Sequence, residues 1–382
     1  MRFPEFHGEW CISTIGEQFD LYSGNTPSRL NKAHFEGNVN WITSGELKEH
    51  YISDTKEKIS EVAATANNLK LLHPGTFVIA IYGLEADGVR GTGSITCKES
   101  TISQACMAFT QKGDVKNEFL YSWYKKHGNI IGIKYAQGTK QQNLSYDILE
   151  KFHIAYPSQD EQDKLIKFIS LLDERIASQS KLIEKLESLI KGIVDCTILR
   201  KEKNAIVGDV CSISEQIRAE ANIDDIITVR LHGNGVCKSS AENLQLGATQ
   251  YYRRRAGQLI YGKQNFHNGA IGIVPISLDN GITSKDIPSF DIDEMKCNSV
   301  YLLAQLQSPQ YYKPAEALTT GTGSKRLKEE TFLKLPIVLP NKREQDNIAV
   351  LIHRASMNLD HAKRLLELLS IQKQFLLRQM FI

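Results

Sequence analysis

The sequence predicts an α+β protein in which two globular domains alternate with two long helices. Three observations predict it: one segment of the chain recurs at a fixed offset, each copy leads into a heptad pattern, and each follows a series of short strand-like runs. The predicted order is a globular domain at 1–157, a helix at 158–203, a globular domain at 204–340 and a helix at 341–382. A repeat this long is a duplicated domain-plus-helix module rather than a solenoid unit.

The repeat is defined by matched residues separated by 183 positions. Gly138-Thr139, Leu144, Pro157 and Glu161-Gln162-Asp163 recur as Gly321-Thr322, Leu327, Pro340 and Glu344-Gln345-Asp346. Behind each proline, Ser158 with Glu161 and Asn341 with Glu344 have the spacing of a helix start.

Apolar residues in the two helical segments alternate at steps of four and three, which is a coiled-coil seam. Gln179 fills one polar slot of the first seam and Lys373 interrupts the second. Such seams often mediate homodimerisation or cover a domain core, but here each has a partner in the same chain. We therefore expect an antiparallel pair that relates the two domains by a pseudo-two-fold axis. The seam residues are Leu165, Ile169, Leu172, Ile176, Ile183, Leu186, Ile190, Ile193, Ile348, Ile352, Leu359, Leu366, Leu369 and Leu376.

Both globular domains read as a curved, mostly antiparallel sheet with helices. In the first, strand-like runs at 75–82 and 104–109 flank a glycine-rich turn region, and a helix is expected over 117–126. The second repeats this plan with runs at 257–261, 269–274 and 282–284 and a helix over 300–307.

Composition places the chain among ordinary soluble proteins, with 41% hydrophobic and 24% charged residues and a formal net charge of +2. Its seven cysteines include no C-x-x-C pair, which argues against a disulfide framework or a zinc site. No signal peptide or membrane-spanning run is recognised, so a cytoplasmic protein without a membrane partner is expected.

Two segments of the first domain resemble the opening of the target recognition domain in type I restriction–modification specificity subunits. These are Ser23-Gly24-Asn25-Thr26-Pro27-Ser28 and Trp41-Ile42-Thr43-Ser44-Gly45-Glu46-Leu47. Gly138-Thr139-x-Gln141-x-Asn143-Leu144, Pro157 and Glu161-Gln162 resemble the close of that domain and the helix after it. The second domain lacks the opening motif and has Ile206-Val207-Gly208-Asp209 and Thr228-Val229-Arg230 instead.

The resemblance implies that each domain reads one half of a bipartite target in double-stranded DNA, while the paired helices set the gap and dock methyltransferase subunits, two of them in the expected complex. Restriction–translocase subunits are a further implied partner. The chain itself would be non-catalytic and hold no cofactor or metal. S-adenosylmethionine, ATP and Mg²⁺ are expected on the partner subunits.

Other function classes stay open beside this one. A self-contained methyltransferase would need an Asn/Asp-Pro-Pro-aromatic motif, and the sequence has no Pro-Pro dipeptide. Gly321-Thr322-Gly323-Ser324-Lys325 lacks the spacing of a phosphate-binding loop. Asp279, Glu294 and Lys296 loosely imitate a nuclease metal site. A coiled-coil adaptor without a nucleic-acid role is the third class.

Candidate DNA contacts combine cations for phosphates with forked polar side chains for base edges. The two copies of the duplicated polar loop are the leading candidates, with a solvated hairpin as the alternative. The Arg253–Arg255 cluster predicts a phosphate clamp or a solvated run. The candidates are Thr43, Ser44, Ser103, Gln104, Thr139, Lys140, Gln141, Asn143, Arg253, Arg254, Arg255, Lys263, Asn265, Thr283, Ser284, Lys325 and Arg326.

Overall fold

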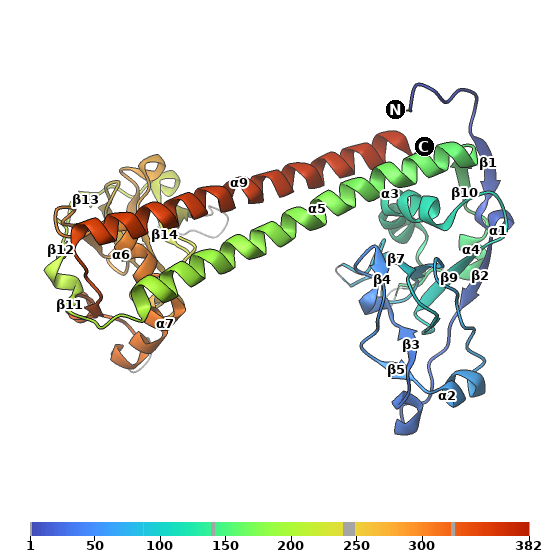
Figure 1. Cartoon of the computed structure of the whole chain (residues 1–382), viewed down its shortest axis with the longest axis horizontal. Helices are drawn as coiled ribbons and strands as arrows, with labels where there is room; N and C mark the ends of the chain where they lie inside the picture. Colours follow the sequence, from blue (N-terminus) through green and yellow to red (C-terminus); the bar gives the residue numbers. More distant parts are fainter. Residues whose placement is uncertain (1, 87, 139–141, 240–248, 322–324, 382) are drawn as a thin grey trace. The chain divides into compact units, whose positions relative to one another are not determined.

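The computed structural model describes residues 2–86, 88–138, 142–239, 249–321 and 325–381. The chain divides into two compact units, each with a globular domain and a part of both long helices. Unit 1 is Met1–Ser178 with Leu366–Ile382, and unit 2 is Gln179–Leu365. The long helices are α5 (Gln159–Val194) and α9 (Lys342–Met380), and both pass from one unit to the other (Figure 1).

The globular part of unit 1 is built from short strands, four α-helices and two 3-10 helices, Lys32–Phe35 and Ser44–Glu46, among its described residues. The α-helices are α1 (Ile15–Gln18), α2 (Glu61–Ala66), α3 (Asn117–Tyr135) and α4 (Tyr146–Leu149). The strands are β1 (Cys11–Thr14), β2 (Phe19–Ser23), β3 (Val39–Ile42), β4 (Tyr51–Ile52), β5 (Lys58–Ile59), β6 (Phe77–Ala80), β7 (Gly93–Thr96), β8 (Ser100–Ile102), β9 (Cys106–Gln111) and β10 (His153–Tyr156).

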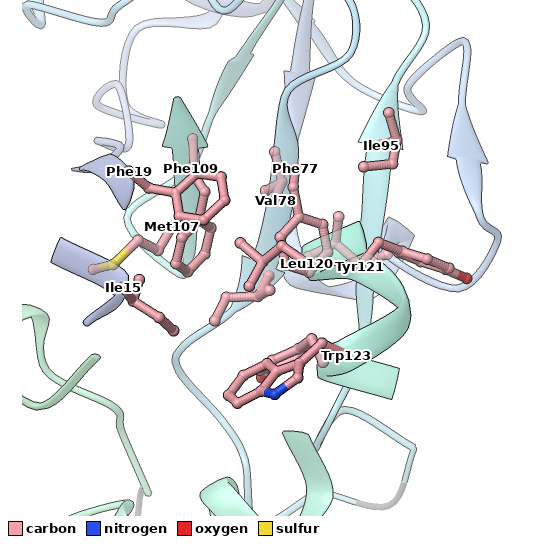
Figure 2. Packing of buried hydrophobic residues seen from close by; sticks show 14 of the residues in the cluster. Ile15, Phe19, Phe77, Val78, Ile95, Met107, Phe109, Leu120, Tyr121 and Trp123 are labelled. Atoms are coloured by element: carbon pink, nitrogen blue, oxygen red, sulfur yellow. The ribbon is translucent and has the colours of Figure 1, made fainter. Parts of the chain in front are cut away.

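The main sheet of unit 1 has the order β2-β9-β6-β7-β4, and a smaller sheet has the order β5-β3-β8. Pairing is antiparallel except between β4 and β7 and between β3 and β8. Side chains of β6 and β9, such as Phe77 and Phe109, pack with Leu120 and Trp123 of α3 in the core (Figure 2). Pairing is therefore mostly antiparallel, as predicted, with one parallel pair in each of these sheets, and α3 runs nine residues beyond the predicted end at 126.

Unit 2 repeats the plan with shorter elements. Its helices are α6 (Ser299–Leu306), α7 (Pro309–Tyr312) and α8 (Glu329–Leu333), and α5 ends there in a π-helical turn over Asp195–Leu199. The strands are β11 (Ala205–Ile206), β12 (Cys211–Ile213), β13 (Arg218–Ala219), β14 (Ile227–Val229), β15 (Val236–Lys238), β16 (Tyr251–Arg253), β17 (Leu259–Tyr261), β18 (Ile271–Ile273), β19 (Ile282–Ser284), β20 (Ser289–Ile292) and β21 (Pro336–Ile337). Its larger sheets have the orders β12-β20-β17-β18 and β13-β16-β19.

The helices α5 and α9 pair antiparallel within each unit. In unit 1, Lys373 of α9 forms an ion pair with Asp173 of α5. In unit 2, Gln179 Nε2 donates to the carbonyl of Ala362, 3.1 Å away. Every residue of the predicted seam is buried or half-buried. The α+β class with two long helices agrees with the sequence-based prediction.

The glutamine of the repeated Glu-Gln-Asp sequence anchors the start of each long helix. Gln162, fully buried, accepts a hydrogen bond from the backbone of Lys116 at 3.0 Å and donates to the carbonyls of Asp114 and Pro157. Gln345 makes the same three bonds in unit 2, to Asn298, Lys296 and Pro340. One buried amide thus fixes the start of each long helix to the loop that precedes the domain helix.

Candidate DNA-binding surface

Two parallel strands of unit 1 bring several predicted residues to one sheet edge. Strands β3 and β8 run parallel, with Ile42 paired to Ile102, so the residues that follow them emerge together. The backbone N–H of Ser103 donates to the carbonyl of Ile42 at 2.9 Å. Thr43 and Ser44 are half-buried there and Gln104 is exposed. Hydroxyl and amide groups at one edge have the chemistry that reads base edges.

The opening motif crosses these strand ends at very close range. A Cβ on Gly24 would lie 1.9 Å from the carbonyl oxygen of Ile102, which only glycine avoids. The indole N–H of Trp41 donates to the carbonyl of Asn25 at 3.2 Å. The two halves of the motif therefore hold each other against the sheet edge.

The residues that flank the duplicated polar loop lie beside the end of the equivalent strand in each unit. In unit 1, Gln137 and Asn143 exchange two backbone hydrogen bonds, and Leu144 N–H donates to the carbonyl of Ile81 at 2.9 Å. In unit 2, Thr320 and Arg326 exchange the same two bonds. Leu327 there donates to the carbonyl of Lys263 at 2.8 Å. Three candidates of the unit 1 loop, Thr139, Lys140 and Gln141, lie outside the described residues.

In unit 2 this arrangement lines a basic hollow. Its lining includes Lys263, Lys285, Arg326, Lys328 and Glu329. Arg326 pairs with Asp286 at 3.2 Å, and Lys325 pairs with Glu316 at 3.3 Å. The side chains of both pairs are about half exposed. Exposed ion pairs contribute little to stability, so a DNA phosphate can replace the carboxylate as the partner of Lys325 or Arg326.

Two cations of this hollow, Lys285 and Lys328, were not among the sequence-based candidates. Both are exposed. Lys285 directly follows the candidate Ser284, and Lys328 lies two positions after the candidate Arg326. Their closeness to the duplicated loop and to the matched strand end is the sequence feature that could have identified both lysines as candidates.

The structure corrects the predicted role of Arg254. Its side chain is completely buried, and its guanidinium donates to Thr283, Ser289 and Ile287, so it does not face a phosphate. Burial lowers the pKa of Arg254 to about 10. Arg254 directly follows the end of β16, and its side chain is buried there while Arg253 and Arg255 stay exposed.

Other candidates are also less available than predicted. Ser103 and Thr283 are buried, with 3% and 1% of their surface exposed, and their hydroxyls bond within the protein. Lys263 has 12% of its side chain exposed and pairs with Glu329 at 2.7 Å. These three residues shape the strand ends rather than present a free contact.

The remaining candidates are exposed but lie away from the hollow or on its border. Arg253 is paired in register with Ile282, the opposite end of β19 from Ser284, and Arg255 follows further along. Asn265 is exposed, and its side-chain oxygen accepts from Asn268 at 3.2 Å. The structure therefore groups Ser284, Lys325 and Arg326 but separates the arginine run from them.

Both carboxylate oxygens of Asp279 accept hydrogen bonds from the protein, from Ala256 and Asn280. Across the ranges that the structure describes, no helix is long and apolar enough to cross a bilayer.

A duplicated α+β domain with paired long helices and a polar strand-end surface defines the class of this protein. The family model described as "Type I restriction modification DNA specificity domain" matches residues 7–188. The matched segment comprises the first globular domain and most of α5, and it is similar to the DNA specificity domains of type I restriction–modification systems.

Curated relatives come from Methanocaldococcus jannaschii. The chain is 27% identical to the type I restriction enzyme MjaIX specificity subunit over 185 residues, which cover 47% of this chain and 42% of that protein. It is 20% identical to the MjaVIII specificity subunit over 385 residues, covering 91% of this chain and 87% of that protein. The match to the first relative thus spans less than half of its length.

Solved structures show the same fold. A type I restriction–modification S subunit from M. genitalium superposes with a TM-score of 0.65 at 14% identity, over 100% of this chain and 99% of the other. A structure from a study of complex assembly and conformational transition in a type I system gives a TM-score of 0.54 at 12% identity, over 98% of each chain.

Proposed function

We propose that this chain is the DNA-reading subunit of a type I restriction–modification complex, in which each globular domain reads one half of a bipartite target. The observation that carries the proposal is the repeated strand-end surface. The same backbone hydrogen bonds join the residues that flank the polar loop in both units, while the side chains in the two copies differ, as two different half-sites require.

The helices α5 and α9 would set the gap between the half-sites and dock two methyltransferase subunits in the cytoplasm. Restriction–translocase subunits would complete the complex. The chain itself catalyses nothing under this proposal, and S-adenosylmethionine, ATP and Mg²⁺ are bound by its partners. Methylation of DNA by the purified chain alone would contradict this and favour a self-contained methyltransferase.

A domain exchange tests the modular part of the proposal. Residues 10–156 are replaced by the corresponding domain of a related subunit, and the host genome is mapped for methylation. We expect one half-site to change and the other to stay. A change in both half-sites would refute the assignment of one half-site to each domain.

Two lysine variants test the surface of unit 2. The complex with Lys285→Ala or Lys328→Ala should bind a labelled duplex more weakly, and the slope of log affinity against log salt should fall by about one for each lost phosphate contact. Lys296→Ala, an exposed lysine outside the hollow, is the matched control. Unchanged slopes in both test variants would refute the surface.

A further inference from the structure

Arg254 is a buried cation without a counter-ion among the described residues. Arg253 and Arg255 on either side are exposed, whereas no part of Arg254 is accessible to solvent. The charged group lies 5.7 Å from the centre of the Tyr252 ring, and the described ion pairs of the chain do not include it. Since an apolar side chain would fill a core more cheaply, a buried arginine needs a reason.

The guanidinium ties together two consecutive strands, β19 and β20, which belong to different sheets. Its Nε donates to the Thr283 hydroxyl at 2.8 Å, on β19, and Nη1 donates to the Ser289 hydroxyl at 3.1 Å, on β20. Nη2 donates to the carbonyl of Ile287 at 3.0 Å, in the connecting turn. The Thr283 hydroxyl in turn donates to the same carbonyl at 3.0 Å. Only a planar fork of donors reaches three acceptors placed in this way.

The turn held by Arg254 carries residues of the basic hollow. Ile287 N–H donates to the carbonyl of Ser284 at 3.1 Å, which closes the turn around Lys285 and Asp286. The carbonyl of Asp286 accepts from the backbone of Lys263 at 2.9 Å, and its carboxylate pairs with Arg326. The shape of this turn therefore sets where Lys285 and Arg326 stand.

We propose that Arg254 is a positioning residue of the DNA-binding surface: its three-way fork fixes the 284–288 turn so that Lys285 reaches a phosphate, while Arg254 itself never touches DNA. This inference rests on the proposed function. It explains why the middle arginine of the run is buried, and why the residues it binds are the hydroxyls of Thr283 and Ser289 rather than a carboxylate.

The test uses the full chain in its complex and a labelled DNA duplex of mixed sequence, titrated between about 50 and 200 mM salt. Arg254→Met removes charge and fork, and Arg254→Lys keeps the charge but not the fork. Both should weaken binding about tenfold and lower the salt slope by about one, as is expected for Lys285→Ala. Arg218→Met on the neighbouring strand β13 measures the loss of one exposed charge on the same sheet.

A purely structural role would lower the melting temperature yet leave the salt slope of the folded protein unchanged, and that result would overturn the proposal. Wild-type binding by Arg254→Lys would overturn it too, because charge rather than the fork would then suffice. Should both variants fail to fold, Thr283→Val, which removes only the relay hydroxyl, is expected to weaken binding and to speed amide exchange at Ile287. Unchanged binding and exchange in that variant would count against the proposal.

The lysine control separates two kinds of failure. If Lys285→Ala lowers the slope but the Arg254 variants do not, only this inference fails. If Lys285→Ala and Lys328→Ala both leave the slope unchanged, the surface assignment fails and this inference fails with it.

Discussion

A charged cluster in unit 1 predicts a pH-dependent attachment of the globular domain to the helix pair. His50, from the domain, has its Nε2 2.8 Å from the carboxylate of Glu118 and its Nδ1 3.4 Å from Asp173 of α5. Asp173 also pairs with Lys373 of α9. The side chains of Asp173 and Lys373 are 24% and 17% exposed, so solvent screens this pair only in part.

The perturbation is Asp173→Asn, which keeps the shape and removes the charge. It leaves His50 and Lys373 without their shared carboxylate, and breaking a partly buried pair in this way costs about 2 kcal/mol. For a unit of roughly 200 residues, each kcal/mol lowers the melting temperature by about 2–4 °C. We therefore expect the unfolding transition of unit 1 to fall by about 4–8 °C.

The pH dependence follows from the charges around the imidazole. Burial lowers the pKa of His50, but the hydrogen bonds and charges of Asp173 and Glu118 outweigh it, so the pKa of His50 is raised overall. A raised histidine pKa stabilises the fold fully below its ordinary value of about 6.5, and this contribution is lost as the pH rises through the folded-state pKa. The penalty of Asp173→Asn should accordingly be larger at about pH 6 than at about pH 7.

The assay must stay below the range in which a neighbouring lysine titrates. Burial, together with the charge of Lys373, lowers the pKa of Lys125 to about 8. The charged form of Lys125 therefore destabilises the fold below that pH, and this destabilisation is lost as the pH rises further. The titratable and charged groups around His50 are Glu49, Tyr51, Glu118, Tyr121, Lys125, Asp173 and Lys373.

Thermal unfolding at both pH values, followed by calorimetry, measures the effect. The control is Glu187→Gln, which breaks the interhelical pair of Lys363 and Glu187, where both side chains are 51% exposed. That exposed pair should contribute less than about 1 kcal/mol. Wild-type stability of Asp173→Asn at pH 6, or a penalty equal to that of the control, would refute the reasoning.

Three further outcomes are expected. Gln162→Ala should lose about 1–3 kcal/mol of stability by chemical denaturation, because it leaves buried backbone groups of two loops unpaired; a neutral effect would contradict the anchoring role. Gly24→Ala should destabilise unit 1 strongly by the same measurement, while Gly45→Ala, which meets nothing within 4 Å, should not. Four residues inserted between Ile190 and Arg200 add about 6 Å of helix, so a methylation map should show the gap grow by one or two base pairs with both half-sites kept; an unchanged gap with full activity would show that the helices do not set it.

The parts of the fold that the sequence predicts are those that periodicity and duplication encode. The seam pattern identifies α5 and α9 because a helix buries one stripe of its surface. Gln162 and Gln345 mark the starts of the two long helices. The sequence shows this because the same three hydrogen bonds form at both places and require a glutamine each time. Short strands such as β3 and β8 carry no such signal, and their parallel pairing depends on contacts distant in the sequence.

The site is less predictable, because exposure depends on tertiary packing. Arg254 and Arg255 are adjacent and chemically identical in sequence, yet one is buried and the other exposed. Lys263 has the composition of a phosphate contact but is engaged by Glu329. Conversely, Lys285 gains its proposed role only from the turn in which it lies, which the sequence alone does not locate.

Duplication and divergence act on different atoms in this protein. The same backbone hydrogen bonds form within each unit. Gln137 and Asn143 exchange two bonds in unit 1, and Thr320 and Arg326 exchange two in unit 2. The side chains at these positions differ, with the amide of Asn143 in one unit and the guanidinium of Arg326 in the other. Since base reading depends on side chains, whereas the shape of the strand ends depends on the backbone, one scaffold can present two different surfaces to DNA. Arg254 extends this logic, because a buried side chain there fixes a backbone turn and leaves the exposed positions of that turn free to vary.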